Sequence, residues 1–211
     1  MATTIALTST AETNAPYKLG SPPDFGTLYS GRALEFDGVT DYVDTGATFQ
    51  TTFDGSFTIS SWIKPDDGNP SSYQIICGLQ NSPTEDAVFI TLDTGGTIDF
   101  VYETDNDRAV AATDAAVFAN GSTNWTHLVC VANDSSNQLS IYVNGQSVTL
   151  DGTNNGDASG ETFADFVIAV SFFIGARNEN GTAGNLFTGK LTNFQIWDKV
   201  WSLSDVQYAY T

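Results

Sequence analysis

Apolar and polar residues alternate in short runs along most of the chain, which is the pattern of β-strands. In the run 57–66 (FTISSWIKPD), one alternating set contains Phe57 and Ile59 and the other contains Trp62, so both faces carry apolar bulk. A strand with two apolar faces is predicted to lie in the middle of a sheet, and Pro65 ends it. Further strands are predicted at 73–79, 87–92 and 97–102.

A β-hairpin is predicted around Asn144-Gly145. These two residues separate alternating runs, and Asn-Gly is the preferred pair in a two-residue type I′ turn. We therefore expect residues 140–143 to pair with residues 147–150 in antiparallel fashion.

The segment 171–210 has the pattern of a strand, a Gly-rich loop, a second strand and a short helix. Ser204 is predicted to cap this helix, with Gln207 completing a capping box and with Leu203 and Tyr208 placed for a hydrophobic staple. A two-turn helix does not persist alone, so it needs tertiary contacts. We expect those contacts from aromatic residues of this segment: Trp197, Trp201 and Tyr208.

Length and composition favour one all-β domain. The chain has 211 residues, of which 41% are hydrophobic and 12% aromatic, and this is enough to fill a two-sheet sandwich. No apolar run approaches the roughly 18 residues that a membrane span needs.

Residues 1–30 are rich in Thr, Ala and Pro, and Pro disfavours regular pairing. We predict an extended N-terminal arm at 1–30 and a single domain at 31–211.

The charge balance is strongly acidic, with 25 acidic residues against 7 basic ones and a net charge of -18. This argues against binding to a nucleic-acid backbone. It suits divalent cations or cationic partners, and it also serves solubility alone. Residues 1–20 lack the basic start and the continuous apolar stretch of a secretion signal.

Cys77 and Cys130 lie in strand-like runs and are expected to be buried free thiols, with a bridge between them as the alternative.

Four motifs follow one another in the order of a known family: ALEFDGVTDYV at 33–43, FTISSWIKP at 57–65, WTHLVCVA with LSIYVNG at 125–145, and a closing segment. The closing motif consists of Ile174, Gly175, Phe187, Gly189, Leu191, Ile196, Trp197, Asp198, Leu203, Ser204 and Val206. Together these motifs resemble the laminin G-like and pentraxin-like domains of the concanavalin A-like jelly-roll superfamily over residues 32–210. The resemblance implies a two-sheet antiparallel jelly-roll sandwich with one short C-terminal helix. The pentraxin disulfide is missing, because Ser60 stands at its second position.

The residues do not favour catalysis. Jelly-roll β-glucanases of this fold carry paired carboxylates in an E-x-D-x-x-E strand, and the most similar string, 103–108, ends in Arg108 where the second Glu is required. The only histidine, His127, matches a structural strand position of the family and is predicted to be a hydrogen-bonded core or edge residue. Triads and His-rich metal sites therefore lack parts, and we expect no enzyme activity.

Calcium is the cofactor that the resemblance implies. Calcium prefers six to eight oxygen ligands, and in pentraxins the equivalents of two loops of this chain, 80–86 and 177–185, hold the calcium ions through which ligand is bound. One ion is predicted between these loops. The predicted ligands are Glu85, Asp86, Asn178 and Glu179.

The same second loop carries the predicted ligand-binding residues: Arg177, Asn178, Asn180 and Asn185. Arg177 stands where the family has a carboxylate, and it is suited to bind an acidic sugar or to pair with a neighbouring carboxylate. The alternative is that these are solvated loop residues without a ligand.

The predicted function is recognition without catalysis, in which the chain binds a cell-surface glycan or protein, assisted by calcium, outside the cell or on a virion surface. A structural protein of a virion, such as a capsid decoration or a tail adhesion appendage, is the first alternative. A carbohydrate-active enzyme with a lost or altered catalytic motif is the second. The arm at 1–30 is predicted to contribute to a homo-oligomer or a larger viral assembly. These functions come from the resemblance, because a fold alone does not fix a function.

Overall fold

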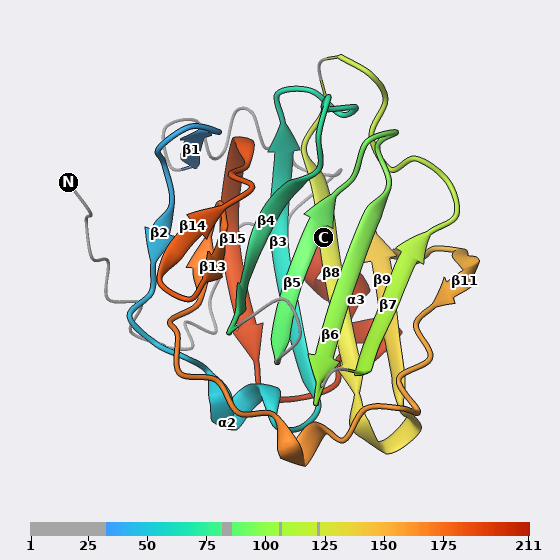
Figure 1. Cartoon of the computed structure of the whole chain (residues 1–211). Helices are drawn as coiled ribbons and strands as arrows, with labels where there is room; N and C mark the ends of the chain where they lie inside the picture. Colours follow the sequence, from blue (N-terminus) through green and yellow to red (C-terminus); the bar gives the residue numbers. More distant parts are fainter. Residues whose placement is uncertain (1–32, 82–85, 106, 122) are drawn as a thin grey trace.

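The structure is a computed structural model that describes residues 33–81, 86–105, 107–121 and 123–211. Within these residues the chain forms two β-sheets that pack face to face (Figure 1). The predicted all-β jelly-roll sandwich is confirmed. The arm predicted at 1–30 lies outside the described residues. No helix in the described part of the chain is both long and apolar enough to cross a membrane.

The first sheet has six strands in its described part. In spatial order they are β1 (Leu34–Asp37), β15 (Thr188–Trp197), β3 (Phe57–Pro65), β8 (Thr126–Asn133), β9 (Gln138–Val143) and β10 (Gln146–Ser147). All its pairings are antiparallel. Strand β3 lies between β15 and β8, and eight of its nine residues are buried. The predicted central strand is confirmed.

The second sheet has nine strands in the residues that the structure describes. Seven of them follow the order β11 (Leu150–Asn155), β7 (Asp107–Thr113), β6 (Ile98–Thr104), β5 (Ala87–Leu92), β4 (Gln74–Gln80), β12 (Phe173–Ile174) and β2 (Val43–Asp44). The other two, β13 (Arg177–Glu179) and β14 (Thr182–Gly184), form a hairpin. Strand β13 runs parallel to β4, whereas the other pairings are antiparallel.

Short helices complete the described structure: α2 (Gln50–Phe53), the 3-10 turns η1 (Asp134–Ser136) and η2 (Phe163–Asp165), and α3 (Leu203–Tyr210).

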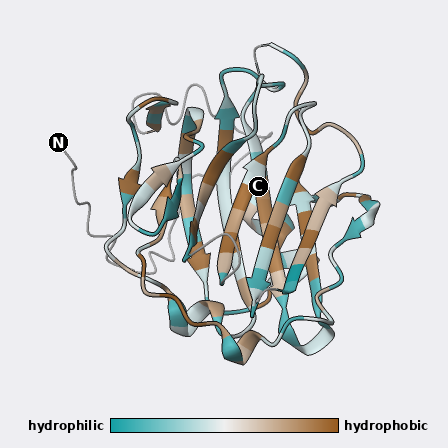
Figure 2. Ribbon diagram, viewed as in Figure 1, coloured by the Kyte–Doolittle hydropathy of each residue, from teal (hydrophilic) through white to brown (hydrophobic). Residues whose placement is uncertain are grey.

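Figure 2 shows that hydrophobic residues concentrate in the strands, whereas most connecting loops are hydrophilic. The core between the sheets is rich in fully buried aromatic side chains: Phe53, Phe57, Phe100, Tyr102, Phe163, Phe166, Phe172 and Phe187. Helix α2 places Phe53 against Phe57, with ring centroids 4.8 Å apart. Cys77 and Cys130 are buried free thiols in this core, as predicted.

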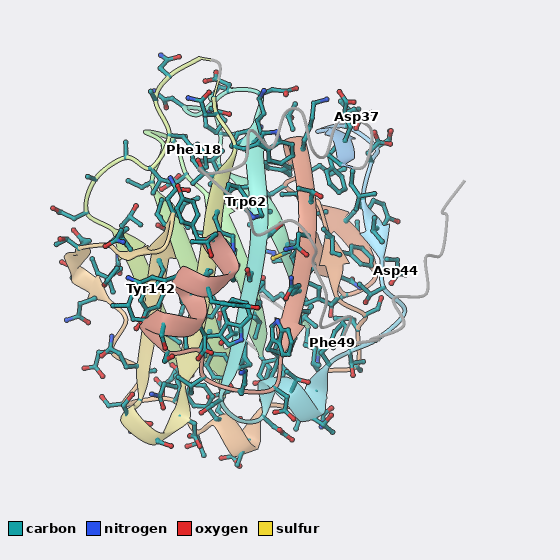
Figure 3. All side chains as sticks on the ribbon, turned by 180° about the vertical axis from the view of Figure 1, so that it is seen from behind. Asp37, Asp44, Phe49, Trp62, Phe118 and Tyr142 are labelled. Carbon is teal, nitrogen blue, oxygen red and sulfur yellow. The ribbon has the colours of Figure 1, made fainter. Side chains whose placement is uncertain are left out.

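Helix α3 lies on the outer face of the six-stranded sheet, as the reverse view in Figure 3 shows. It buries Val206 together with Trp201 against Val129 and Val131 of β8. Its last residue, Tyr210, stacks on Trp62 with a ring-centroid distance of 5.6 Å. The outer face of the nine-stranded sheet points the other way, toward the viewer in Figure 1.

The structure corrects the predicted helix cap. Ser202, not Ser204, is the N-cap, and its capping-box partner is Asp205 instead of Gln207. Leu203 and Tyr208 do not form a buried staple, because their side chains are 47% and 69% exposed.

The predicted hairpin is shorter than expected. Its Asn144-Gly145 turn is confirmed, with φ values of 50° and 77°. However, β10 pairs with β9 only at Gln146 and Ser147. Leu150 pairs with Thr113 of β7 instead. The Val148 N–H still donates to the Ile141 carbonyl of β9 at 3.3 Å. The chain therefore crosses to the other sheet between Val148 and Leu150, where the tertiary pairing replaces the local one.

Candidate functional site

The pairing register of β4, β5, β6 and β7 fixes which residues share the outer face of the nine-stranded sheet. Phe89 lies opposite Gly78 on one side and Val101 on the other. Two residues further along the strands, Ala87 lies opposite Glu103, which in turn lies opposite Arg108. Since side chains alternate along a strand, these residues point away from the core between the sheets.

An apolar cluster lies on this outer face, separate from the main core. It comprises Ile75, Ala87, Phe89, Val101 and the partly buried Val110. Phe89 is only 4% exposed although it lies on the outer face of the sheet. Gly78 permits the close approach of β4 to β5, because a Cβ atom at Gly78 would lie 2.3 Å from the Phe89 Cβ.

Two arginines cover Phe89. The guanidinium carbon of Arg177 lies 4.7 Å from the Phe89 ring centroid, and that of Arg108 lies 5.5 Å from it. Both distances are within the range of cation–π interaction. Arg177 comes from β13, which the parallel pairing with β4 places opposite Gly78, whereas Arg108 comes from β7. We call this surface, formed by Phe89, Glu103, Arg108 and Arg177, the arginine face.

Arg177 and Arg108 are the only arginines in the described part of the chain. Arg177 forms an ion pair with Glu179, and its side chain is 13% exposed. Arg108 is exposed and forms no ion pair with any described residue. The arginine face therefore brings both described arginines together, beside the carboxyl groups of Glu103 and Glu179, in a protein whose net charge is -18.

Two buried polar atoms of the arginine face have no hydrogen-bond partner among the described residues: Glu103 Oε2 and Arg177 Nε. Burial raises the pKa of Glu103, and the nearby Arg108 opposes this shift. Burial lowers the pKa of Arg177, with Tyr73 acting in the opposite direction. Buried polar groups are normally satisfied, so these two atoms mark a place where a bound molecule would supply partners.

The residues predicted to bind calcium are engaged elsewhere where the structure describes them. The Asp86 carboxylate accepts hydrogen bonds from the backbone N–H groups of Asp105, at 3.2 Å, and of Val167. The Asn178 side-chain oxygen accepts a hydrogen bond from the Gly181 N–H at 2.6 Å, and Glu179 pairs with Arg177.

Glu85, the fourth predicted ligand, lies outside the described residues. Across the described ranges, no three His, Cys, Asp or Glu side chains gather as a metal-binding group. Three of the four predicted ligands thus make contacts within the fold, and the calcium site stays a prediction.

The predicted ligand-binding residues separate into two kinds. Arg177 lies on the arginine face, whereas Asn178 is 2% exposed and its amide donates to the Ser171 carbonyl at 2.8 Å. Asn180 and Asn185 adopt positive φ values of 51° in the turns that flank β14, a conformation that Asn tolerates better than most residues. The geometry thus gives Asn178, Asn180 and Asn185 roles in loop structure.

The string 103–108 forms the hairpin between β6 and β7. Glu103 pairs with Arg108 and Thr104 with Asp107, and Asp105 has a positive φ of 49° in the turn. Asp105 and Asp107 therefore belong to a tight turn or its edge, whereas Glu103 lies on β6. His127 is buried, and its Nε2 lies 3.0 Å from Ser60 Oγ, which confirms the predicted structural role.

Sequence reasoning identified Arg177 but missed Phe89, and it assigned Glu103 and Arg108 only to the broken catalytic string. Alternation within 87–92 and 97–102 indicated strands there, but it carried no information on which strands are neighbours. The register that joins these residues to Arg177 depends on non-local pairing.

The strand order and pairings define a concanavalin A-like jelly roll. A profile described as the concanavalin A-like lectin/glucanases superfamily, of laminin G type, matches residues 37–207. The chain belongs to this superfamily, which confirms the resemblance seen in the motifs. A search of the curated proteins finds no match for this chain.

Three solved structures illustrate the likeness in fold. A mutant of NanB sialidase from Streptococcus pneumoniae is 19% identical with a TM-score of 0.66, and the match covers 83% of this chain but 27% of the sialidase. The Ruminococcus gnavus IT-sialidase CBM40 bound to α2,3-sialyllactose is 14% identical with a TM-score of 0.66, covering 85% of this chain and 96% of that domain. The native heptameric SAP-like pentraxin from Limulus polyphemus is 15% identical with a TM-score of 0.55, covering 84% of this chain and 80% of the pentraxin. At these identities the likeness concerns the fold alone.

Proposed function

We propose that this chain is a non-catalytic recognition domain that binds an acidic glycan on the arginine face. The observation that carries the proposal is that both arginines of the described chain cover one phenylalanine on an outer sheet face. A protein of net charge -18 repels anions over most of its surface. Two guanidinium groups at one place are therefore a specific feature, and they suit an anionic ligand.

The chemistry of the face favours a carboxylated sugar. A guanidinium group presents paired N–H donors that match the geometry of a carboxylate. The apolar cluster around Phe89 is buried beneath the two guanidinium groups, so it supports the arginine side chains and does not itself offer a surface to the sugar. The similar CBM40 domain was solved with sialyllactose, a glycan with a carboxylate, and this supports the same class of ligand here.

The absence of catalysis is part of the proposal. Glycoside hydrolysis in most families uses two carboxyl groups, one on each side of the scissile bond. Glu179 is held in its ion pair with Arg177 beside the arginine face. It is therefore not free to act with Glu103 as an acid and nucleophile pair. Roles in a virion, in adhesion or in assembly through the arm stay predictions.

Isothermal titration with α2,3-sialyllactose and with neutral lactose tests the proposal. Arg108→Ala and Arg177→Ala should each weaken the binding of sialyllactose by about 10-fold or more, because each removes hydrogen bonds to a charged group, worth about 1.5–3 kcal/mol. Lys64→Ala is the matched control, since Lys64 lies on β3 of the other sheet. No free sialic acid should appear on prolonged incubation. If acidic glycans bind no better than lactose, or if both arginine variants bind like the wild type, the proposal fails.

A further inference from the structure

Glu103 is an unusual residue to find on an anion-binding face. It lies on β6, one row along the sheet from Phe89 and opposite Arg108. Its side chain is 4% exposed, and Oε2 has no hydrogen-bond partner among the described residues. An acidic group at this place repels anions, so it is not explained by charge attraction to the ligand.

Arg108 lies opposite Glu103 on the neighbouring strand β7. Burial raises the pKa of Glu103, whereas Arg108 and, to a smaller extent, Arg177 favour its charged form. Neither forms an ion pair with it, because Arg177 pairs with Glu179 and Arg108 pairs with no described residue. Glu103 therefore contributes a hydrogen-bond acceptor beside two groups of donors.

Two neighbouring carboxylates, those of Asp86 and Glu161, differ from that of Glu103 because both accept hydrogen bonds from the protein. Asp86 accepts hydrogen bonds from two backbone N–H groups, and the Glu161 carboxylate accepts from the Thr104 N–H and hydroxyl, each at 2.8 Å. These two acids serve the local fold. Glu103 has an acceptor left over on the face where the arginines lie.

We infer that Glu103 is a specificity-determining residue of the arginine face, accepting a hydrogen bond from a ligand hydroxyl or amide N–H that lies next to the ligand's anionic group. This inference rests on the proposed function. It restricts the ligand to sugar acids with a donor beside the carboxylate. A sulfate ester without neighbouring hydroxyl groups presents only acceptor oxygens, so it would meet Glu103 as a like charge without a compensating hydrogen bond.

The test compares two anionic ligands, sialyllactose and methyl sulfate, by isothermal titration. Sialyllactose carries a carboxylate with hydroxyl and amide donors, whereas methyl sulfate carries a sulfate ester and no hydrogen-bond donor. The wild type should bind sialyllactose more tightly. Glu103→Gln should reduce the ratio of the two affinities at least about 10-fold, because a hydrogen bond to a charged group is lost and the new amide N–H can donate to sulfate oxygens.

Two further variants make the result interpretable. Glu103→Ala should also reduce the ratio of the two affinities. Because the Gln side chain in Glu103→Gln keeps an acceptor oxygen, the Ala variant shows the effect of removing every acceptor at this position. Asp107→Asn is the charge-matched control, since it removes one negative charge from the same hairpin at an exposed position, and it should leave the ratio unchanged. Thermal melting of each variant confirms that it is folded.

The outcomes separate this inference from the proposed function. If the wild type binds neither ligand, both fail. If the wild type binds both ligands equally, in a manner that depends on Arg108 and Arg177, the acidic-glycan function stands and the role of Glu103 is refuted. The role of Glu103 is also refuted if Glu103→Gln and Glu103→Ala keep the wild-type ratio.

Discussion

The buried histidine should make the stability of this protein depend on pH in a way that can be isolated. Burial lowers the pKa of His127 to about 4, from an ordinary value of 6.5. His127 lies under Trp62 and Tyr210, with ring-centroid distances of 5.2 and 6.1 Å. Its Nδ1 is buried without a hydrogen-bond partner among the described residues. A proton on this ring would therefore be poorly solvated.

The sign of the effect follows from linkage. In the unfolded chain the imidazole binds a proton near pH 6.5, whereas in the folded chain it does so only near pH 4. The unfolded state thus binds more protons in this window, and stability falls as pH is lowered through it. The full shift corresponds to roughly 3 kcal/mol, of which about 2 kcal/mol is lost between pH 7 and pH 5.

Urea denaturation of the wild type and of His127→Gln at pH 7 and pH 5 measures this contribution. Buried carboxyl groups act in the opposite direction, since burial raises the pKa of Asp99 to about 6 and also raises that of Glu161. These groups are present in both proteins, so they cancel in the comparison. His127 is the only histidine of the chain. The free energy of unfolding of the wild type should fall by about 2 kcal/mol more than that of the variant. Equal changes in the two proteins would refute the reasoning.

Three further predictions concern the cap, the predicted metal and the arm. Ser202→Ala removes the N-cap of α3 and should lower the free energy of unfolding by about 1 kcal/mol in urea titrations, whereas Ser204→Ala, at the position first predicted to be the cap, should have a smaller effect. Because the described oxygens of the predicted calcium site are engaged, we expect equal melting temperatures in calcium and in chelator; a higher melting temperature in calcium that is lost in Glu179→Gln would support the sequence-based site. Deleting residues 2–28 should leave a cooperative melting transition, since the described core begins at Phe36; a chain that no longer melts cooperatively would show that the arm is part of the fold.

The sequence was sufficient to predict the two-sheet sandwich and several of its strands, but it was not sufficient to choose between two equivalent local signals for the start of the helix. Ser202 with Asp205 and Ser204 with Gln207 both satisfy the capping-box spacing. The structure selects Ser202 because the preceding residue is fixed by tertiary contacts. Trp201 is 6% exposed, and its backbone N–H donates a hydrogen bond to Thr58 Oγ1 at 3.1 Å. This contact anchors the chain immediately before the helix and so determines where the helix begins.

The site illustrates a similar limit. Arg177 was identified because it departs from the family pattern, but the residues that give it a role come from three other strands. Phe89 and Glu103 reach it only through the parallel pairing of β13 with β4 and the register of β4, β5 and β6. A shift of one residue in any of these pairings would move the side chains to the opposite face. No local pattern in the sequence records that register.

The acidic surface of the protein does not conflict with anion binding at the arginine face, because the two electrostatic effects act over different distances. Repulsion between the net charge of -18 and an anionic glycan acts at long range, and salt screens it over about 8 Å at physiological ionic strength. Hydrogen bonds from Arg108 and Arg177 would act at contact, and Arg177 is partly buried, where screening is weaker. Long-range repulsion would therefore disfavour nonspecific contact with anionic surfaces more than it would disfavour the proposed binding at the arginine face. If the proposal holds, this acidic protein would gain selectivity from the same charge that lowers its general attraction for anions.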